Sequence, residues 1–105
     1  MNYGIADKSY EMILKTISSF NDIDEAILFG SRAMGNAKNG SDIDISLKGE
    51  NINLEMIVHL SSLLNEQLPL PYYFDILDYN KISNMNLKKI IDSDGKTIYK
   101  RENLT

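Results

Sequence analysis

The stretch FGSRAMGNAKNGSDIDIS, residues 29–46, carries the pattern that decides the fold. It ends in a strict alternation that places Asp42, Asp44 and Ser46 on one face of a strand and aliphatic residues on the other. Two carboxylates about 4 Å apart repel by roughly 4 kcal/mol at an effective dielectric constant near 20. A fold tolerates such a pair if it is well solvated, if one group is protonated, or if a cation lies between them. Hard oxygen ligands in this arrangement favour Mg²⁺ or Mn²⁺.

The loop before this strand offers groups that suit an anion. Gly30 and Ser31 stand where the preceding apolar segment, residues 24–29, ends. Glycine lets a ligand approach the backbone, the adjacent amides can point at an anion, and the serine hydroxyl can donate to a phosphate oxygen. Arg32 and Lys38 are further charge partners for phosphates, and the sequence does not decide between them. Loop and strand together predict a site for a phosphate bound through a metal.

The flanking segments predict a single α/β (α+β) domain over residues 1–105, a small mixed β-sheet with helices packed on one side. Apolar residues at helical spacing predict the helices, and β-branched, aromatic or alternating runs predict the strands. In chain order the predicted elements are a helix over 7–20, strands over 24–29 and 41–48, a helix over 53–67, a strand over 72–79, a helix over 84–92 and an edge strand over 96–101.

The composition excludes several kinds of protein and site. The chain has no cysteine, which excludes disulfides, thiolate metal sites and cysteine nucleophiles. Its formal charge of −4 disfavours non-specific binding of nucleic acid, because phosphate neutralisation dominates that affinity. No apolar run approaches the roughly 20 residues needed to cross a bilayer, and no secretory leader is visible. We therefore expect a cytoplasmic protein without a membrane partner.

The pattern Gly-Ser-Arg-Ala-x-Gly followed by Ser-Asp-Ile-Asp, residues 30–35 and 41–44, resembles the signature of the DNA polymerase β-like nucleotidyltransferase superfamily. Its short form is similar to the minimal nucleotidyltransferase (MNT) branch, the MntA-like antitoxins of HEPN/MNT toxin–antitoxin pairs. Length and element order fit that branch over essentially the whole chain. The resemblance implies the polymerase β-like nucleotidyltransferase fold. The sequence departs from the pattern at Met34, where many relatives carry a second arginine, and this weakens the expected grip on phosphate.

The resemblance also implies a third carboxylate on a neighbouring strand. Asp75 and Asp78 are the candidates, and their spacing puts them on opposite sides of a strand. The hydrophobic-Asp-hydrophobic pattern of the family favours Asp75, and Asp78 is the alternative if it faces the site. The aromatic residues beside Asp75 are interpreted as core and sheet residues: Tyr72, Tyr73 and Phe74.

By this resemblance the chain would transfer a nucleoside monophosphate from ATP or another NTP and release pyrophosphate. The catalytic residues and metal ligands would be the three aspartates, Asp42, Asp44 and Asp75, which would hold two Mg²⁺ ions. Asp75 could also act as the general base. The nucleotide would be bound by the loop residues Gly30, Ser31 and Arg32.

The implied partner is a small helical HEPN-domain protein, with AMP transferred onto one of its tyrosines. Two alternatives stay open: transfer onto a small-molecule hydroxyl, as on an aminoglycoside, and an antitoxin that acts by contact without catalysis. Association into a homodimer or a hetero-oligomer is also open. A template nucleic acid is not expected, because the sequence shows no basic path for one.

Overall fold

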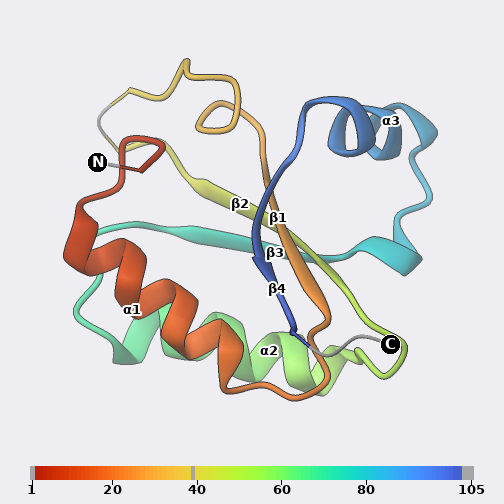
Figure 1. The fold of residues 1–105 in the computed structure, drawn as a ribbon, viewed down its shortest axis with the longest axis horizontal. Helices are drawn as coiled ribbons and strands as arrows, with labels where there is room; N and C mark the ends of the chain where they lie inside the picture. Colours follow the sequence, from red (N-terminus) through yellow and green to blue (C-terminus); the bar gives the residue numbers. More distant parts are fainter. Residues whose placement is uncertain (1, 39, 103–105) are drawn as a thin grey trace.

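The structure, a computed structural model, describes residues 2–38 and 40–102. Within these ranges the helices and strands follow the predicted order: α1 (Asp7–Ser18), β1 (Glu25–Phe29), β2 (Ile43–Lys48), α2 (Leu54–Ser62), β3 (Phe74–Asp78), α3 (Met85–Asp94) and β4 (Lys96–Lys100). A π-helical turn, Leu63–Gln67, continues α2, and a 3₁₀ helix, Tyr79–Lys81, follows β3. The strands form one sheet in the order β3-β2-β1-β4 (Figure 1).

The sheet is mixed, as predicted. β1 runs antiparallel to both β2 and β4, whereas β2 and β3 are parallel. Parallel neighbours cannot be joined by a tight turn, and α2 supplies the crossover between them. The register of the parallel pair sets Asp44 directly beside Asp75. The N-terminal ends of β2 and β3 therefore lie side by side at the same end of the sheet.

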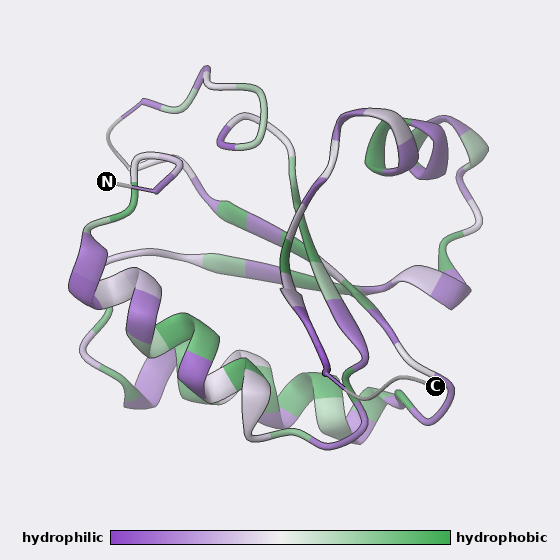
Figure 2. Cartoon of the chain, in the orientation of Figure 1, coloured by the Kyte–Doolittle hydropathy of each residue, from purple (hydrophilic) through white to green (hydrophobic). Residues whose placement is uncertain are grey.

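α1 and α2 cover one face of the sheet (Figure 1). Ile17 of α1 and Leu60 of α2 are fully buried there and join the core with the alternate residues of the strands, such as Leu28 and Ile45. The alternation is visible in Figure 2 as green and purple bands along β2 and β3. It follows from the two-residue period of strands, which sends every second side chain into this core.

The prediction of helices on one side holds for α1 and α2, whereas α3 lies over the opposite face. There Ile91 of α3 packs against Ile27 and Phe29 of β1. β1 is apolar on both faces, so its second face also needs cover. Leu77, near the C-terminal end of β3, packs against the same cluster. α3 thus covers the side of the sheet where β3 ends and leaves the N-terminal ends of β2 and β3 open.

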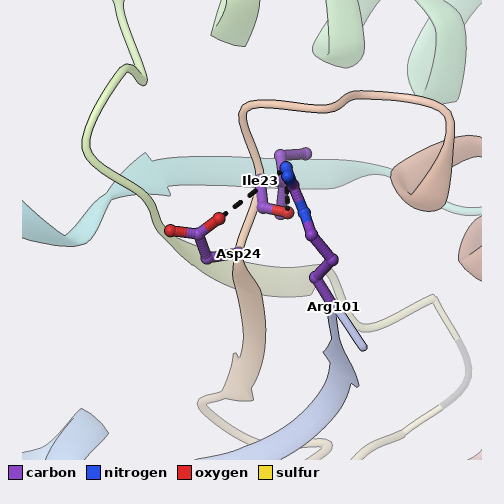
Figure 3. Close-up of polar contacts among 3 residues, drawn as sticks. All are labelled: Ile23, Asp24 and Arg101. Atoms are coloured by element: carbon purple, nitrogen blue, oxygen red, sulfur yellow. Dashed lines mark hydrogen bonds and ion pairs between the residues drawn. The ribbon is translucent and has the colours of Figure 1, made fainter. Parts of the chain in front are cut away.

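Arg101, just after β4, is tied to the segment before β1. Its backbone N–H donates to Asp24 O at 2.8 Å. Its guanidinium donates to Ile23 O at 3.3 Å and lies 3.7 Å from the Asp24 carboxylate (Figure 3). The ion pair is partly exposed and contributes at most about 1 kcal/mol.

No helix within the described ranges is long and apolar enough to cross a membrane.

Asn65, in the π-helical turn, forms hydrogen bonds with backbone groups on the outer edge of β3. Its side-chain carbonyl accepts from Phe74 N at 2.7 Å, and its amide donates to Phe74 O at 3.1 Å. The side chain thereby does at one residue what a neighbouring strand would do along the edge. Because Phe74 immediately precedes Asp75, the same contact helps fix where that carboxylate stands.

We expect Asn65→Ala to lower the free energy of unfolding by about 1–3 kcal/mol, because it leaves two backbone groups of Phe74 without their partner. Urea denaturation measures this change. Gln67→Ala is the matched control, since Gln67 is exposed and its amide donates to the Ser62 hydroxyl at 3.1 Å rather than to a backbone group of a strand. The control should change stability by less than about 0.5 kcal/mol. Equal, small losses in both variants would contradict this role for Asn65.

Candidate active site

The structure brings three aspartates together at the exposed N-terminal ends of β2 and β3. Asp44 and Asp75 are direct neighbours in the parallel pair, and Asp42 stands just before β2. Asp42 and Asp75 are exposed and Asp44 is half-buried, while the intervening Ile43 is fully buried on the other face. Ser46 continues the face of Asp44 but is fully buried, and its hydroxyl has no hydrogen-bond partner among the described residues. The open part of this face thus ends between Asp44 and Ser46.

Partial burial and the two neighbouring carboxylates both disfavour ionisation of Asp44. Burial raises the pKa of the Asp44 carboxyl, and the charges of Asp75 and Asp42 raise it further. Loss of water and like charges both disfavour the ionised form. A cation at this position would reverse the second effect, because it favours the charged carboxylates.

Asp78 lies on the opposite face of β3 from Asp75. It is 9% exposed, and its side chain accepts from Asn80 N at 3.1 Å, which caps the 3₁₀ helix. Phe74 and Ile76 share its face and are buried in the main core. Of the two candidates for the third carboxylate, the structure therefore places Asp75, and not Asp78, beside Asp44.

Gly30 lies directly against the Asp44 carboxylate. Its φ is +79°, and a Cβ added there would lie 2.5 Å from Asp44 Oδ2. After Gly30 the chain folds back in a helical turn, in which Met34 N donates to Gly30 O at 3.2 Å and Asn36 N donates to Ser31 O at 2.9 Å. The first amides of such a turn have no partner within it. The glycine loop and the carboxylate strand are thus in contact, and any side chain at Gly30 would separate them.

Arg32 lies inside the loop rather than on its surface. It is 4% exposed, and its guanidinium donates to two backbone carbonyls, those of Ser41 and Tyr3. This geometry does not favour the predicted contact with phosphates. Lys38, the other cationic residue considered, is exposed.

The interpretation of Tyr73 as a core residue is wrong, because 62% of it is exposed. Its carbonyl accepts from Ile43 N at 2.8 Å, which extends the parallel pairing one step before β3. Tyr73 therefore shares the side of Asp75. Tyr72 and Phe74 do pack against the core. An aromatic run alone does not reveal which member faces out, because the phase of the alternation depends on the register with β2.

The three aspartates fit a hard divalent cation, although they do not enclose one. Among the described residues, no group of three or more His, Asp or Glu side chains is already arranged to hold a metal. Mg²⁺ usually keeps several waters and is bound through one or two carboxylates together with substrate phosphates. An all-oxygen set that is open on one side leaves room for the waters that such a cation keeps, and substrate phosphates can replace those waters.

The model of a known protein family, described as polymerase beta, nucleotidyltransferase, matches residues 11–104. The chain belongs to this family. The matched range contains the glycine-serine loop and all three aspartates of the site. The predicted polymerase β-like fold is thereby confirmed, and the chain is a nucleotidyltransferase domain.

Several solved structures share the fold of this nucleotidyltransferase domain. A chain of a toxin–antitoxin crystallised with AMP-PNP is 21% identical with a TM-score of 0.72, over 89% of this chain and 74% of that chain. A chain of a tri-AMPylated Shewanella oneidensis HEPN toxin in complex with MNT antitoxin is 19% identical with a TM-score of 0.66, over 90% and 71%. A putative nucleotidyltransferase from Sulfolobus solfataricus is 24% identical with a TM-score of 0.51, over 91% and 87%. No curated protein matches the sequence.

We expect Gly30→Ala to weaken binding of Mg²⁺ with a non-transferable ATP analogue by about tenfold or more. The new Cβ displaces the Asp44 carboxylate, and disturbing the position of a metal ligand typically costs about 10- to 100-fold in metal affinity. Isothermal titration calorimetry measures the affinity. Gly40→Ala is the matched control, because Gly40 has φ +84° and a Cβ there meets nothing within 4 Å. Equal losses in the two variants would show that backbone strain, and not the contact with Asp44, is responsible.

We expect Asp44→Asn to raise the free energy of unfolding of the metal-free protein at neutral pH. The pKa of Asp44 is higher in the folded state than its ordinary value, so folded protein binds more protons just above that value. Stability therefore falls as pH rises through this window, and an amide removes the penalty. Thermal unfolding in EDTA from about pH 4 to about pH 8 measures it. Asp22→Asn, at an exposed position before β1, is the control. A less stable Asp44→Asn protein would contradict the argument.

Proposed function

We propose that this chain transfers AMP from ATP to a tyrosine hydroxyl of a helical HEPN-domain toxin and so acts as its antitoxin. The observation that carries the proposal is the pairing of Asp44 with Asp75, with Gly30 against the Asp44 carboxylate, in a nucleotidyltransferase domain. Support for the substrate and partner comes from two proteins of similar fold. One is a toxin–antitoxin with AMP-PNP, and the other is a tri-AMPylated HEPN toxin with its MNT antitoxin.

The residues have distinct roles in this proposal. Asp42, Asp44 and Asp75 would hold Mg²⁺, which when bound neutralises phosphate charge and favours displacement at phosphorus. Gly30 lets the triphosphate approach the backbone, and the Ser31 hydroxyl would donate to a phosphate oxygen. The acceptor oxygen forms a bond to the α-phosphorus while the bond to the pyrophosphate oxygen breaks. Asp75, exposed beside Asp44, would take the proton that the acceptor hydroxyl loses.

The open face favours a macromolecular acceptor over a small hydroxylated molecule. A groove of about 610 Å³ lies between α1 and the π-helical turn, and one of about 530 Å³ lies between α2, β3 and α3. Neither is lined by Asp42, Asp44 or Asp75. Small-molecule sites are usually concave and bury most of their ligand. An acceptor that brings its own surface, as a protein does, suits exposed aspartates better.

The contact-only antitoxin is less well supported. Burial, and after it the charges of Asp75 and Asp42, raises the pKa of Asp44, so keeping this carboxylate ionised beside the other two opposes folding at neutral pH. A surface used only for contact would gain stability by replacing one of them. The cost has a reason if the carboxylates bind a cation during catalysis.

We expect Mg²⁺ and ATP to add AMP to a purified HEPN-domain partner in the presence of this chain, and Asp42→Asn to slow the transfer at least about 100-fold. Loss of a metal ligand removes several kcal/mol of charge stabilisation in the transition state. Intact mass spectrometry of the partner measures both the extent of transfer and its rate.

Asp22→Asn serves as the control for this experiment and should transfer AMP at the wild-type rate. Complex formation without added mass would favour the contact-only antitoxin. Transfer to an aminoglycoside-like hydroxyl, with none to the protein, would favour the small-molecule alternative. Transfer that Asp42→Asn does not slow would remove this aspartate from the metal site.

A further inference from the structure

Arg32 is a buried cation whose hydrogen-bond acceptors are backbone carbonyls. Nε and Nη2 both donate to Ser41 O, at 3.2 and 2.8 Å, and Nη1 donates to Tyr3 O at 3.1 Å. The guanidinium carbon also lies 5.2 Å from the centre of the Tyr72 ring. A buried charge is costly unless its hydrogen bonds are satisfied, so this arrangement requires a specific reason.

These contacts join the segments that carry the active site. Arg32 follows Gly30 and Ser31, so its own backbone belongs to the glycine-serine loop. Ser41, which accepts two of its hydrogen bonds, is the residue before Asp42. Tyr72, under the guanidinium, leads into β3 and Asp75. One side chain therefore closes the loop on itself and links it to the strand of the third carboxylate.

The N-terminal turn completes the contact. Asn2 and Ile5 exchange two backbone hydrogen bonds, at 3.1 and 2.8 Å, around Tyr3 and Gly4, whose φ values are +57° and +75°. Two successive left-handed residues are typical of a type I′ turn, which directs the Tyr3 carbonyl to Arg32. A non-glycine residue with positive φ is strained and persists where its surroundings impose it.

The turn is also held close to both Arg32 and Tyr72. A Cβ added to Gly4 would lie 3.0 Å from Arg32 Nη1. Ala6 N, just after the turn, donates to the Tyr72 hydroxyl at 3.0 Å. The turn, the arginine and the tyrosine thus form one connected unit beside the loop.

We propose that Arg32 is a positioning residue that, together with the N-terminal turn, holds Asp42 in place beside Asp44 and Asp75, and that it is not a phosphate ligand. The inference rests on the proposed function, in which these aspartates hold a divalent cation. Lysine cannot replace this arginine, because its single ammonium lacks the planar fork that donates twice to Ser41 O. Without that fork the loop end before Asp42 loses its tie to the loop start.

Binding of Mn²⁺ in the absence of nucleotide, followed by electron paramagnetic resonance titration, tests this role. A phosphate ligand affects the metal only through the nucleotide, whereas a positioning residue affects it with no nucleotide present. We expect Arg32→Lys and Gly4→Ala to weaken Mn²⁺ binding by about tenfold or more, the effect typical of residues that orient metal ligands. Gly4→Ala keeps the arginine and brings a Cβ to 3.0 Å from Arg32 Nη1, in addition to the strain of an alanine at φ +75°.

Each variant has a matched control. Arg101→Lys changes an arginine that also donates to a backbone carbonyl, that of Ile23, near the opposite end of β1. Gly40→Ala imposes similar backbone strain to Gly4→Ala without a close neighbour. Both controls should bind Mn²⁺ within about twofold of wild type, and thermal unfolding should show that all four proteins are folded. Because a general loss of stability would act in test and control variants alike, a selective loss of Mn²⁺ affinity identifies positioning.

Unchanged Mn²⁺ binding by Arg32→Lys would overturn the proposal, and reduced binding of an ATP analogue in that variant would make Arg32 a phosphate ligand instead. An effect of Arg32→Lys without one of Gly4→Ala would overturn the role of the N-terminal turn. Asp42→Asn separates this inference from the proposed function. If Asp42→Asn leaves Mn²⁺ binding unchanged, the metal site itself is wrong. If only Asp42→Asn weakens binding, the metal site stands and the positioning role falls.

Discussion

The parallel pairing of β2 with β3, in register at Asp44 and Asp75, is the constraint on which the rest of the structure depends. A parallel pair needs a long crossover, and α2 supplies it while covering the core face of both strands. β3 then lies at the edge of the sheet, where Asn65 satisfies its outer side at Phe74. A shift of this register by one residue would turn Asp75 toward the core and bring Asp78 to the open face.

The same pairing places like charges close together, and the conformation of the loop after β1 leaves room for them. Carboxylates on adjacent strands repel, and this repulsion contributes to the raised pKa of Asp44. Gly30 gives the Asp44 carboxylate room, because no side chain fills the space beside it. The Arg32 guanidinium, two residues farther on, braces the loop from within through Ser41 and Tyr3. The loop that shapes the site is therefore held mainly by hydrogen bonds to its own backbone and to the N-terminal turn.

The sequence predicted the order of elements and the shared face of Asp42 and Asp44, because the two-residue period of a strand is a local property. The same rule placed Asp75 and Asp78 on opposite sides of their strand, and the family resemblance favoured Asp75. The sequence did not reveal that α3 packs on the opposite face of the sheet. Ile91 of α3 packs against residues of β1, and this contact exists only once the sheet has formed. Nor did the sequence predict the exposure of Tyr73 or the burial of Arg32. Both depend on contacts between segments far apart in sequence, such as Arg32 with Tyr3 and Ile43 with Tyr73.

The exposure of Asp42 and Asp75 bears on how a transfer reaction could be controlled. Transfer to a hydroxyl competes with attack by water, and active sites limit that competition by excluding water as the acceptor binds. α3 covers only the end of this face where β3 finishes, and Asp42 and Asp75 at the opposite end are exposed. In the proposed function the docked partner would provide that cover together with the acceptor tyrosine. Water would then be excluded only in the complex, which would couple transfer to recognition of the partner.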